Sequence, residues 1–354
     1  MSPAPARSKT RTVSTPGPRA WSRYSDTDLL DLRFCDLGLK IEGELAGRID
    51  RLYDDLAAKG LAHFRPHCWL SSEWFSPDGV PGIAIPFYLA RPRLKRLEKT
   101  QMLDVEGGTE TSCLRILRHE AGHCIDTAYR LHRRKRWREL FGSFAEPYPD
   151  AYKPRPNSRK FVTHLDGWYA QAHPAEDFAE TFAVWLQSSR WKSHYRGWPA
   201  MQKLEYVDEL MQEIAASPGP TPVRSRRQVE PLSQDRRTLR EHYRSKRLRY
   251  ADEFPEFFDA DLRKLFSTEP RYAHRPTAAS FLRRIRPELR DAVARWTGTH
   301  AYTIDQVLRD MIDRCKELNL RLAVPETKAK NEAMMMVTVQ TMNYMLSGHH
   351  PVAL

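Results

Sequence analysis

The run His119-Glu120-Ala121-Gly122-His123 places three chemically active side chains within five positions. Residues four apart lie about 40° apart around an α-helix, so two histidines at this spacing can direct their imidazoles at one metal ion. The glutamate between them can reach a water on that metal. Two imidazoles and a carboxylate base are typical of zinc-dependent hydrolysis. The sequence therefore predicts one Zn²⁺ per chain, with His119 and His123 as ligands and Glu120 as general base.

An open catalytic zinc site needs a third protein ligand. The metzincin pattern requires Gly and His at positions 126 and 129, which hold Asp126 and Tyr129 instead. Downstream, Glu176 and Glu180 lie one turn apart on a helix with an acidic first turn. We expect Glu176 as the third ligand and Glu180 as a supporting carboxylate, which is a gluzincin arrangement. A simpler interpretation is that these acids only complement the helix dipole. Other possible third ligands are His173, His164 and His194.

These two segments resemble the catalytic domain of anthrax lethal factor and related gluzincin peptidases. The resemblance rests on residues 119–126, on Tyr169 and on the run Glu176-Asp177-Phe178-Ala179-Glu180-Thr181-Phe182, and it covers roughly residues 110–190. It implies that Glu176 is a zinc ligand, that Tyr169 assists at the transition state, and that Asp126 and Glu180 are supporting carboxylates. The chain departs from that family in His173-Pro174, in a Pro-rich insertion between the two helices, and in its helical C-terminal region.

The expected chemistry is peptide-bond hydrolysis. Zinc would lower the pKa of a bound water to about 7, and Glu120 would take its proton and deliver it to the leaving amine. Zinc and Tyr169 would stabilise the oxyanion. Asp126 or Glu180 would accept a hydrogen bond from a ligating histidine and fix its tautomer. The strand expected at residues 82–89 is the candidate edge for an extended peptide, although a plain core strand is the simpler interpretation.

Helical periodicity and capping residues locate the elements that must position these side chains. The pattern predicts strands at residues 68–72 and 82–89, and helices at residues 42–61, 109–131, 174–187, 199–216, 303–318 and 326–346. The expected fold is α+β and mostly helical. A zincin-like catalytic domain with a small sheet is followed by an all-α region.

Two basic segments carry the whole net charge of +12. Residues 1–24 hold five Lys or Arg and no acid, while residues 217–250 hold ten Lys or Arg and three acids. The rest of the chain is neutral. We expect a disordered basic tail at residues 1–24, the catalytic domain at 25–216, a Pro-rich linker at 217–230, and a helical domain of unknown role at 231–354.

Composition restricts the class of protein further. Five cysteines in 354 residues do not form a disulfide framework. No stretch reaches the roughly 20 apolar residues of a membrane-spanning helix, and the first residues lack the apolar core of a signal peptide. These features predict a cytoplasmic protein.

The sequence favours a zinc metallopeptidase, an endopeptidase acting on a peptide or protein. The alternative is a zinc-binding pseudo-enzyme or interaction module whose basic helical half binds nucleic acid or a protein partner. No zinc-finger spacing or RNP motif supports specific nucleic-acid reading. A zinc amidase acting on a non-peptide amide also remains open. The basic run at residues 130–138 either complements a helix C-terminus or docks an acidic substrate segment.

Overall fold

The computed structural model describes residues 21–156, 158–217, 221, 223–250, 258–346 and 350–351. Within these ranges the chain is mostly helical, with three small two-stranded sheets, in agreement with the mostly helical α+β expectation. None of the helices in the described part is long and apolar enough to cross a membrane. Most of the expected basic tail lies outside the described residues, but Trp21 is buried and its indole Nε1 donates to the Leu37 carbonyl (3.0 Å). The folded part therefore begins earlier than residue 25.

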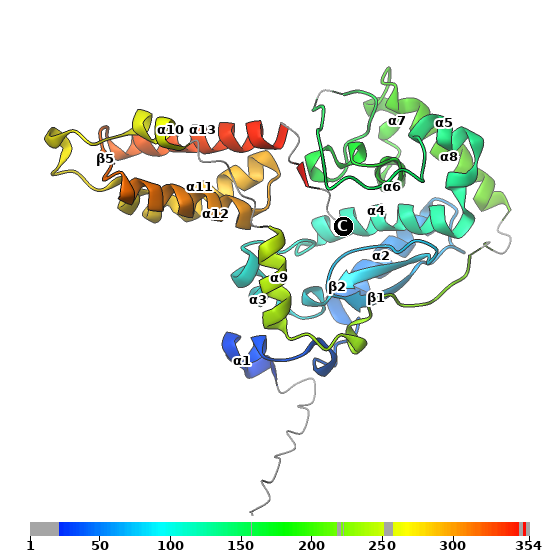
Figure 1. Ribbon diagram of the computed structural model, residues 1–354. Coiled ribbons are helices and arrows are strands. Elements are labelled where there is room, and N and C mark those ends of the chain that lie inside the picture. The colour runs from blue at the N-terminus through cyan, green and yellow to red at the C-terminus, as the bar shows by residue number, and fades with distance from the viewer. Residues whose placement is uncertain are drawn as a thin grey trace, which may run out of the picture.

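The helices fall into two groups along the chain (Figure 1). The first group is α1 (Asp26–Leu30), α2 (Gly43–Ala58), α3 (Pro92–Met102), α4 (Glu110–Tyr129), α5 (Lys135–Phe141), α6 (Pro174–Gln187), α7 (Trp191–His194), α8 (Ala200–Ala216) and α9 (Leu239–Arg249). The second group is α10 (Phe258–Leu265), α11 (Ala278–Thr297), α12 (Ala301–Glu317) and α13 (Glu326–Tyr344). All six helices expected from the sequence are present, with ends within three residues of the expected ones.

The first sheet pairs β1 (His67–Ser71) with β2 (Gly82–Pro86) in parallel, with Cys68 opposite Ile83. The strand expected at 82–89 ends early because residues 87–90 form the 3₁₀ helix η3 (Phe87–Ala90). Two further antiparallel pairs join β3 (Ala151–Tyr152) with β6 (His350–Pro351) and β4 (Phe266–Ser267) with β5 (Arg321–Leu322). The β3–β6 pair ties the end of the chain to the loop between α5 and α6.

The outer edge of β2 is already occupied. Ala84 exchanges two backbone hydrogen bonds with Phe75 (2.9 and 3.4 Å), and the Gly82 N–H donates to the Val80 carbonyl (2.8 Å). Pro86 has no N–H to offer. The expectation that this strand presents a free edge to a peptide is therefore wrong, because its own chain covers that edge.

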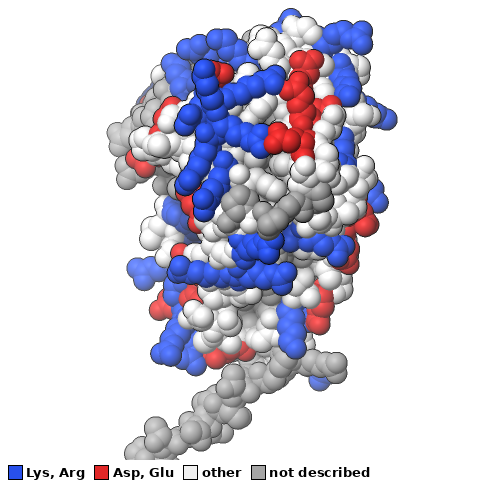
Figure 2. All heavy atoms as spheres, turned by 90° about the vertical axis from the view of Figure 1, so that its right-hand side faces the viewer, with Lys and Arg blue, Asp and Glu red and all other residues white. Residues whose placement is uncertain are grey.

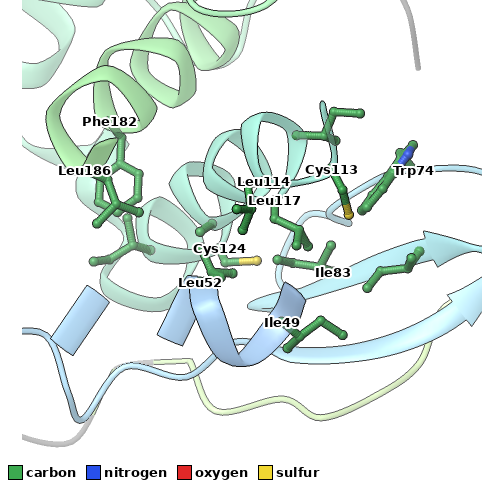
Figure 3. Close-up of a cluster of buried hydrophobic side chains, with 14 of the residues drawn as sticks. Ile49, Leu52, Trp74, Ile83, Cys113, Leu114, Leu117, Cys124, Phe182 and Leu186 are labelled. Atoms are coloured by element: carbon green, nitrogen blue, oxygen red, sulfur yellow. The ribbon is translucent and has the colours of Figure 1, made fainter. Parts of the chain in front are cut away.

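Helix α4 is the centre of the first hydrophobic core. Figure 3 shows Leu117 and Cys124 of α4 packed among residues of α2, β2 and α6, namely Ile49 and Leu52, Ile83, and Phe182 and Leu186. Because α4 is enclosed by several elements, its side chains have fixed positions. This rigidity holds the H-E-x-x-H residues in place.

A second core lies within α10–α13, between residues 262 and 337. Residues 232–250 belong to the first core instead, through Leu232, Leu239 and Tyr243. The helical unit (residues 258–346) therefore starts after Tyr250, later than the boundary expected at residue 231. The buried face of α9 holds Leu239, His242, Tyr243 and Lys246, so the helix lacks a continuous apolar stripe that would indicate its core.

The segment expected as a linker is partly fixed to the first sheet. The carbonyl of Val229 accepts a hydrogen bond from the Trp69 indole (2.9 Å), and the carbonyl of Glu230 accepts one from the Ser71 hydroxyl (2.8 Å). The N–H of Val223 donates to the Ala128 carbonyl at the end of α4 (3.2 Å). Residues 223–230 thus run as an anchored extended segment from the end of α4 along β1.

Candidate metal centre

Helices α4 and α6 bring three potential ligands together. One ligand atom from each of His119, His123 and Glu176 lies within 4.8 Å of the others. The His119 Nε2 lies 2.9 Å from Glu176 Oε2, and the His123 Nε2 lies 3.1 Å from His119 Nε2 and 3.2 Å from Glu176 Oε2. Three donor atoms this close, with two imidazoles and one carboxylate, suit a single Zn²⁺ ion.

The close approach of the two helices depends on Gly122. A Cβ at this position would meet the Cα of Ala179 at 2.8 Å and its carbonyl oxygen at 3.1 Å. Helix α6 starts at Pro174, which suits the first turn of a helix. The side chain of His173 accepts a hydrogen bond from the Ala175 N–H (3.1 Å) and caps this helix. The cap and the small contact residue together place Glu176 opposite the two histidines.

Glu180 supports His119 from behind. Its Oε1 lies 2.8 Å from His119 Nδ1, and its Oε2 accepts the backbone N–H groups of Leu165 (2.8 Å) and His164 (3.2 Å). With Nδ1 donating to this carboxylate, Nε2 is the ring nitrogen that faces His123 and Glu176. A carboxylate that orients an imidazole in this way is common behind metal-ligating histidines.

Tyr148 contacts the site although nothing in the sequence pattern indicated it. Its hydroxyl donates to Glu176 Oε1 (2.7 Å), the carboxylate oxygen not directed at the histidines. Its ring stacks on that of His173 (centroids 3.9 Å apart). The residue lies in the Pro-rich loop between α5 and α6, where no periodicity constrains position. Its only sequence signal is an aromatic residue between two prolines, Pro147 and Pro149.

The other residues considered from the sequence occupy different places. Tyr169 lies beside the cluster, with its ring centroid 5.7 Å from that of His119. Asp126 bonds to His132, through the backbone N–H (2.8 Å) and the Nδ1 (2.7 Å), and therefore supports the chain after α4. Of the rival ligands, His173 is the cap of α6 and His164 bonds to the Arg115 carbonyl (2.9 Å). Neither belongs to the cluster, and His194 is exposed on α7.

The electrostatics of the cluster favour a positive charge at its centre. Burial alone would lower the pKa of His119, but hydrogen bonds with Glu176 and Glu180 outweigh it and raise that pKa well above its ordinary value. The pKa of His123 is also raised, since the charge of Glu176 outweighs burial. Burial would raise the pKa of Glu176, but the two histidines hold it well below the ordinary range. Buried carboxylates that stabilise cationic partners are suited to a metal cation.

Glu120 presents a buried carboxylate oxygen with unused hydrogen-bonding capacity. The side chain is 8% exposed, and its Oε2 has no hydrogen-bond partner among the described residues. A buried unpaired polar atom is costly unless something present during function satisfies it. Glu120 also lines a cavity of about 930 Å³, together with His119, His123, Tyr169 and Glu176. This agrees with a base that waits for water or substrate, so the donor set fits a metal centre.

The basic run at residues 130–138 is exposed on and before α5. Arg134 pairs with Glu213 (2.7 Å) and Arg136 with Glu209 (2.5 Å), so acids of α8 neutralise part of it. On the face drawn in Figure 2, Lys and Arg side chains lie beside a column of Asp and Glu near the top of the view. Docking of an acidic segment on this surface stays a prediction.

Comparison with known proteins gives one match. Residues 109–193 match the model of a family described as "Putative zinc-binding metallo-peptidase". The match spans about a quarter of the 354 residues and contains α4, α6 and the whole His-His-Glu cluster. No curated protein and no solved structure matches the chain. The matched region therefore resembles zinc-binding metallopeptidases, while the likeness to lethal factor and the gluzincin subtype remain predictions.

Proposed function

We propose that this protein is a zinc metallopeptidase of gluzincin type. The observation that carries the proposal is the convergence of His119, His123 and Glu176 from two helices, beside the buried and unpaired oxygen of Glu120. The family match over the same segment supports the peptidase class. The cavity over the cluster gives room for a substrate. A purely structural zinc site has no use for a carboxylate base there.

His119, His123 and Glu176 would hold the metal, and Glu180 would keep the imidazole of His119 in its orientation through Nδ1. Bound zinc supplies Lewis acidity, which activates water near neutral pH and polarises a carbonyl group. The free oxygen of Glu120 takes a proton from the attacking water and passes it to the leaving amine. Tyr169, whose ring lies beside that of His119, would donate a hydrogen bond to the developing oxyanion.

The test measures zinc and peptide hydrolysis separately. We expect about one zinc per chain by elemental mass spectrometry, lost in His123→Ala and in Glu176→Ala but kept in Glu120→Gln. Hydrolysis of a peptide library should fall about 100- to 10,000-fold in Glu120→Gln. Matched controls are Glu110→Gln, an exposed carboxylate at the start of α4, and His194→Ala on α7. Full hydrolysis by Glu120→Gln, or zinc kept by both ligand variants, would overturn the proposal.

A further inference from the structure

Most of the candidate metal centre is buried, and its His123 side chain is partly exposed, at 18%. His119 is 2% exposed, Glu176 4% and Glu120 8%. A scissile bond must come within hydrogen-bond distance of Glu120 to react. A substrate therefore has to enter the cavity of about 930 Å³ rather than lie across the surface. This volume is at the upper end of the range for pockets that enclose small ligands.

The helical unit contributes a wall of this cavity. Its residues Asp291, Ala294, Arg295, residues 298–301, Thr303 and Met345 all line the cavity. The lining residues of the catalytic part include members of α4, the start of α6, the end of α9, the loop that carries Tyr148, and the segments around residues 73–78, 103–106 and 165–169. The cavity is thus lined by two parts of the chain that have separate hydrophobic cores.

Residues 298–303, called the bridge segment below, contact two different walls. On one side, the Thr303 hydroxyl donates to the Tyr250 carbonyl (3.0 Å), and the rings of His300 and Tyr250 lie 4.3 Å apart. On the other side, a Cβ at Gly298 would lie 3.6 Å from the Cβ of Asp166 and 3.7 Å from the Gly167 nitrogen. Tyr250, Asp166 and Gly167 themselves line the cavity. The bridge segment therefore spans the space beside the metal centre.

A third connection holds the helical unit in this place. The backbone of β6 pairs with that of β3, in the loop between α5 and α6 that carries Tyr148. Tyr152 of β3 lines the cavity, and its hydroxyl donates to the Gly167 carbonyl (2.8 Å). The wall is tied to the catalytic part at both the start of α12 and the end of the chain.

We propose that the helical unit restricts this enzyme to short, unstructured peptides. The inference rests on the proposed peptidase function and adds its substrate class. A folded protein would have to unfold locally before a bond could reach Glu120, at a free-energy cost that rises toward its global stability. A long chain would have to continue past the bridge segment in at least one direction. A short peptide meets neither obstacle.

The test uses the full-length, zinc-loaded protein and nested peptides of increasing length around one cleaved sequence. We expect kcat/KM to fall about tenfold or more between the short and long members, and a folded protein carrying the same sequence in a loop to resist cleavage. Equal rates along the series, or cleavage of the folded protein as fast as of the short peptide, would overturn the inference.

A variant probes the wall itself. The double substitution His300→Ala/Thr303→Ala removes two contacts of the bridge segment with Tyr250. We expect the ratio of long-peptide to short-peptide kcat/KM to rise in this variant, while its zinc content stays unchanged. The control Thr338→Ala removes a hydroxyl that bonds to the Met334 carbonyl within α13 (2.8 Å) and should keep the length limit. Thermal melting shows whether the double variant is folded. If it is folded and its length limit is unchanged, the bridge segment does not set that limit.

Binding separates failure of this inference from failure of the proposed function. In the zinc-loaded Glu120→Gln variant, a labelled short peptide should bind saturably and be displaced by unlabelled short peptide but not by the folded protein. Zinc binding with no hydrolysis and no binding of any peptide contradicts both proposals. Hydrolysis of all lengths at equal rate contradicts only the substrate class.

Discussion

At the scale of single residues, the two oxygens of Glu176 have different partners. Oε2 faces both histidines, whereas Oε1 accepts the hydroxyl of Tyr148. A carboxylate with one oxygen held in this way is steered toward binding a metal through the other. Groups behind metal ligands typically change metal affinity 10- to 100-fold. We therefore propose that Tyr148 positions Glu176, the expected third ligand.

We expect Tyr148→Phe to weaken zinc binding by about 10- to 100-fold, because only the hydroxyl that holds Glu176 is lost. Competition with a chelator of known affinity measures this directly. Tyr53→Phe is the matched control, since its hydroxyl bonds to the Pro66 carbonyl (2.8 Å). Wild-type zinc affinity in Tyr148→Phe would show that the hydrogen bond has no positioning role. In contrast, Tyr169→Phe should lower kcat and leave zinc affinity unchanged.

Spacing along a helix was enough to find the residues of the cluster, because positions four apart must share a face. Glu176 was found for a similar reason, as it begins a second helix with a clear start. Tyr148 could not be found in this way. Its loop has no repeating geometry, and its place beside Glu176 follows from tertiary packing against His173. Asp126 shows the converse, since a residue inside the motif bonds to His132 instead.

At the scale of elements, the separation of α4 and α6 decides whether the ligands meet. Gly122 sits where the two helices touch, at the backbone of Ala179. Glu176 and Glu180 both lie on α6, so any shift of this helix moves the proposed metal ligand and its proposed support together. The packing of two helices is thus part of the metal site.

Gly122→Ala should destabilise the protein by about 1–3 kcal/mol through overpacking and should weaken zinc binding, because α6 has to move away. Urea unfolding and chelator competition measure the two effects. The control is Gly47→Ala, in an exposed part of α2 where a Cβ meets nothing within 4 Å. This change should stabilise by up to about 1 kcal/mol. Unchanged zinc affinity in Gly122→Ala would mean that α6 tolerates the shift.

The six helices expected from the sequence lie within three residues of their observed ends, because apolar periodicity and capping residues are local signals. Other helices, such as α3 and α11, were not given bounds from the sequence. In contrast, whether the edge of β2 is free could not be predicted from the sequence. Whether a strand edge is free depends on what covers it, and here residues that follow β1 fold back so that Phe75 pairs with Ala84. No local pattern reports that contact. The sequence also did not predict which hydrophobic core α9 joins, because that depends on tertiary packing and not on a local pattern.

At the scale of the whole molecule, the junction between the two cores contains a partly buried histidine, His300. His300 accepts the Tyr302 N–H at Nδ1 (3.1 Å), which caps α12, and it packs on Tyr250. Burial lowers the pKa of His300 from 6.5 to about 4, with Lys246 and Lys99 adding to the effect and Asp104 opposing it. A protonated ring could no longer accept at Nδ1, so the junction favours the neutral form.

Because the folded pKa of His300 lies below its ordinary value, the unfolded chain takes up the proton first as the pH falls. The contribution of neutral His300 to the free energy of unfolding is complete above pH 6.5 and is lost progressively toward pH 4. We expect a loss of roughly 3 kcal/mol across this window. Thermal melting of the wild type and of His300→Asn, at the low and the high end of this pH window, measures the loss. Asparagine can still cap the helix but does not titrate. An identical pH dependence in both proteins would rule out His300 as its source.

The bridge segment has a consequence for how this chain is made. It is synthesised roughly 120 residues after Glu180, which takes on the order of ten seconds at about 5–20 residues per second. During that interval the nascent chain already contains the residues of α4 and α6 with their histidines and carboxylates. The bridge segment, which we propose excludes long polypeptides, has not yet been made. The nearest long polypeptide at that stage is the newly made part of the same chain. A site that bound zinc this early could cleave it, so the order of zinc binding and synthesis decides whether the chain stays intact.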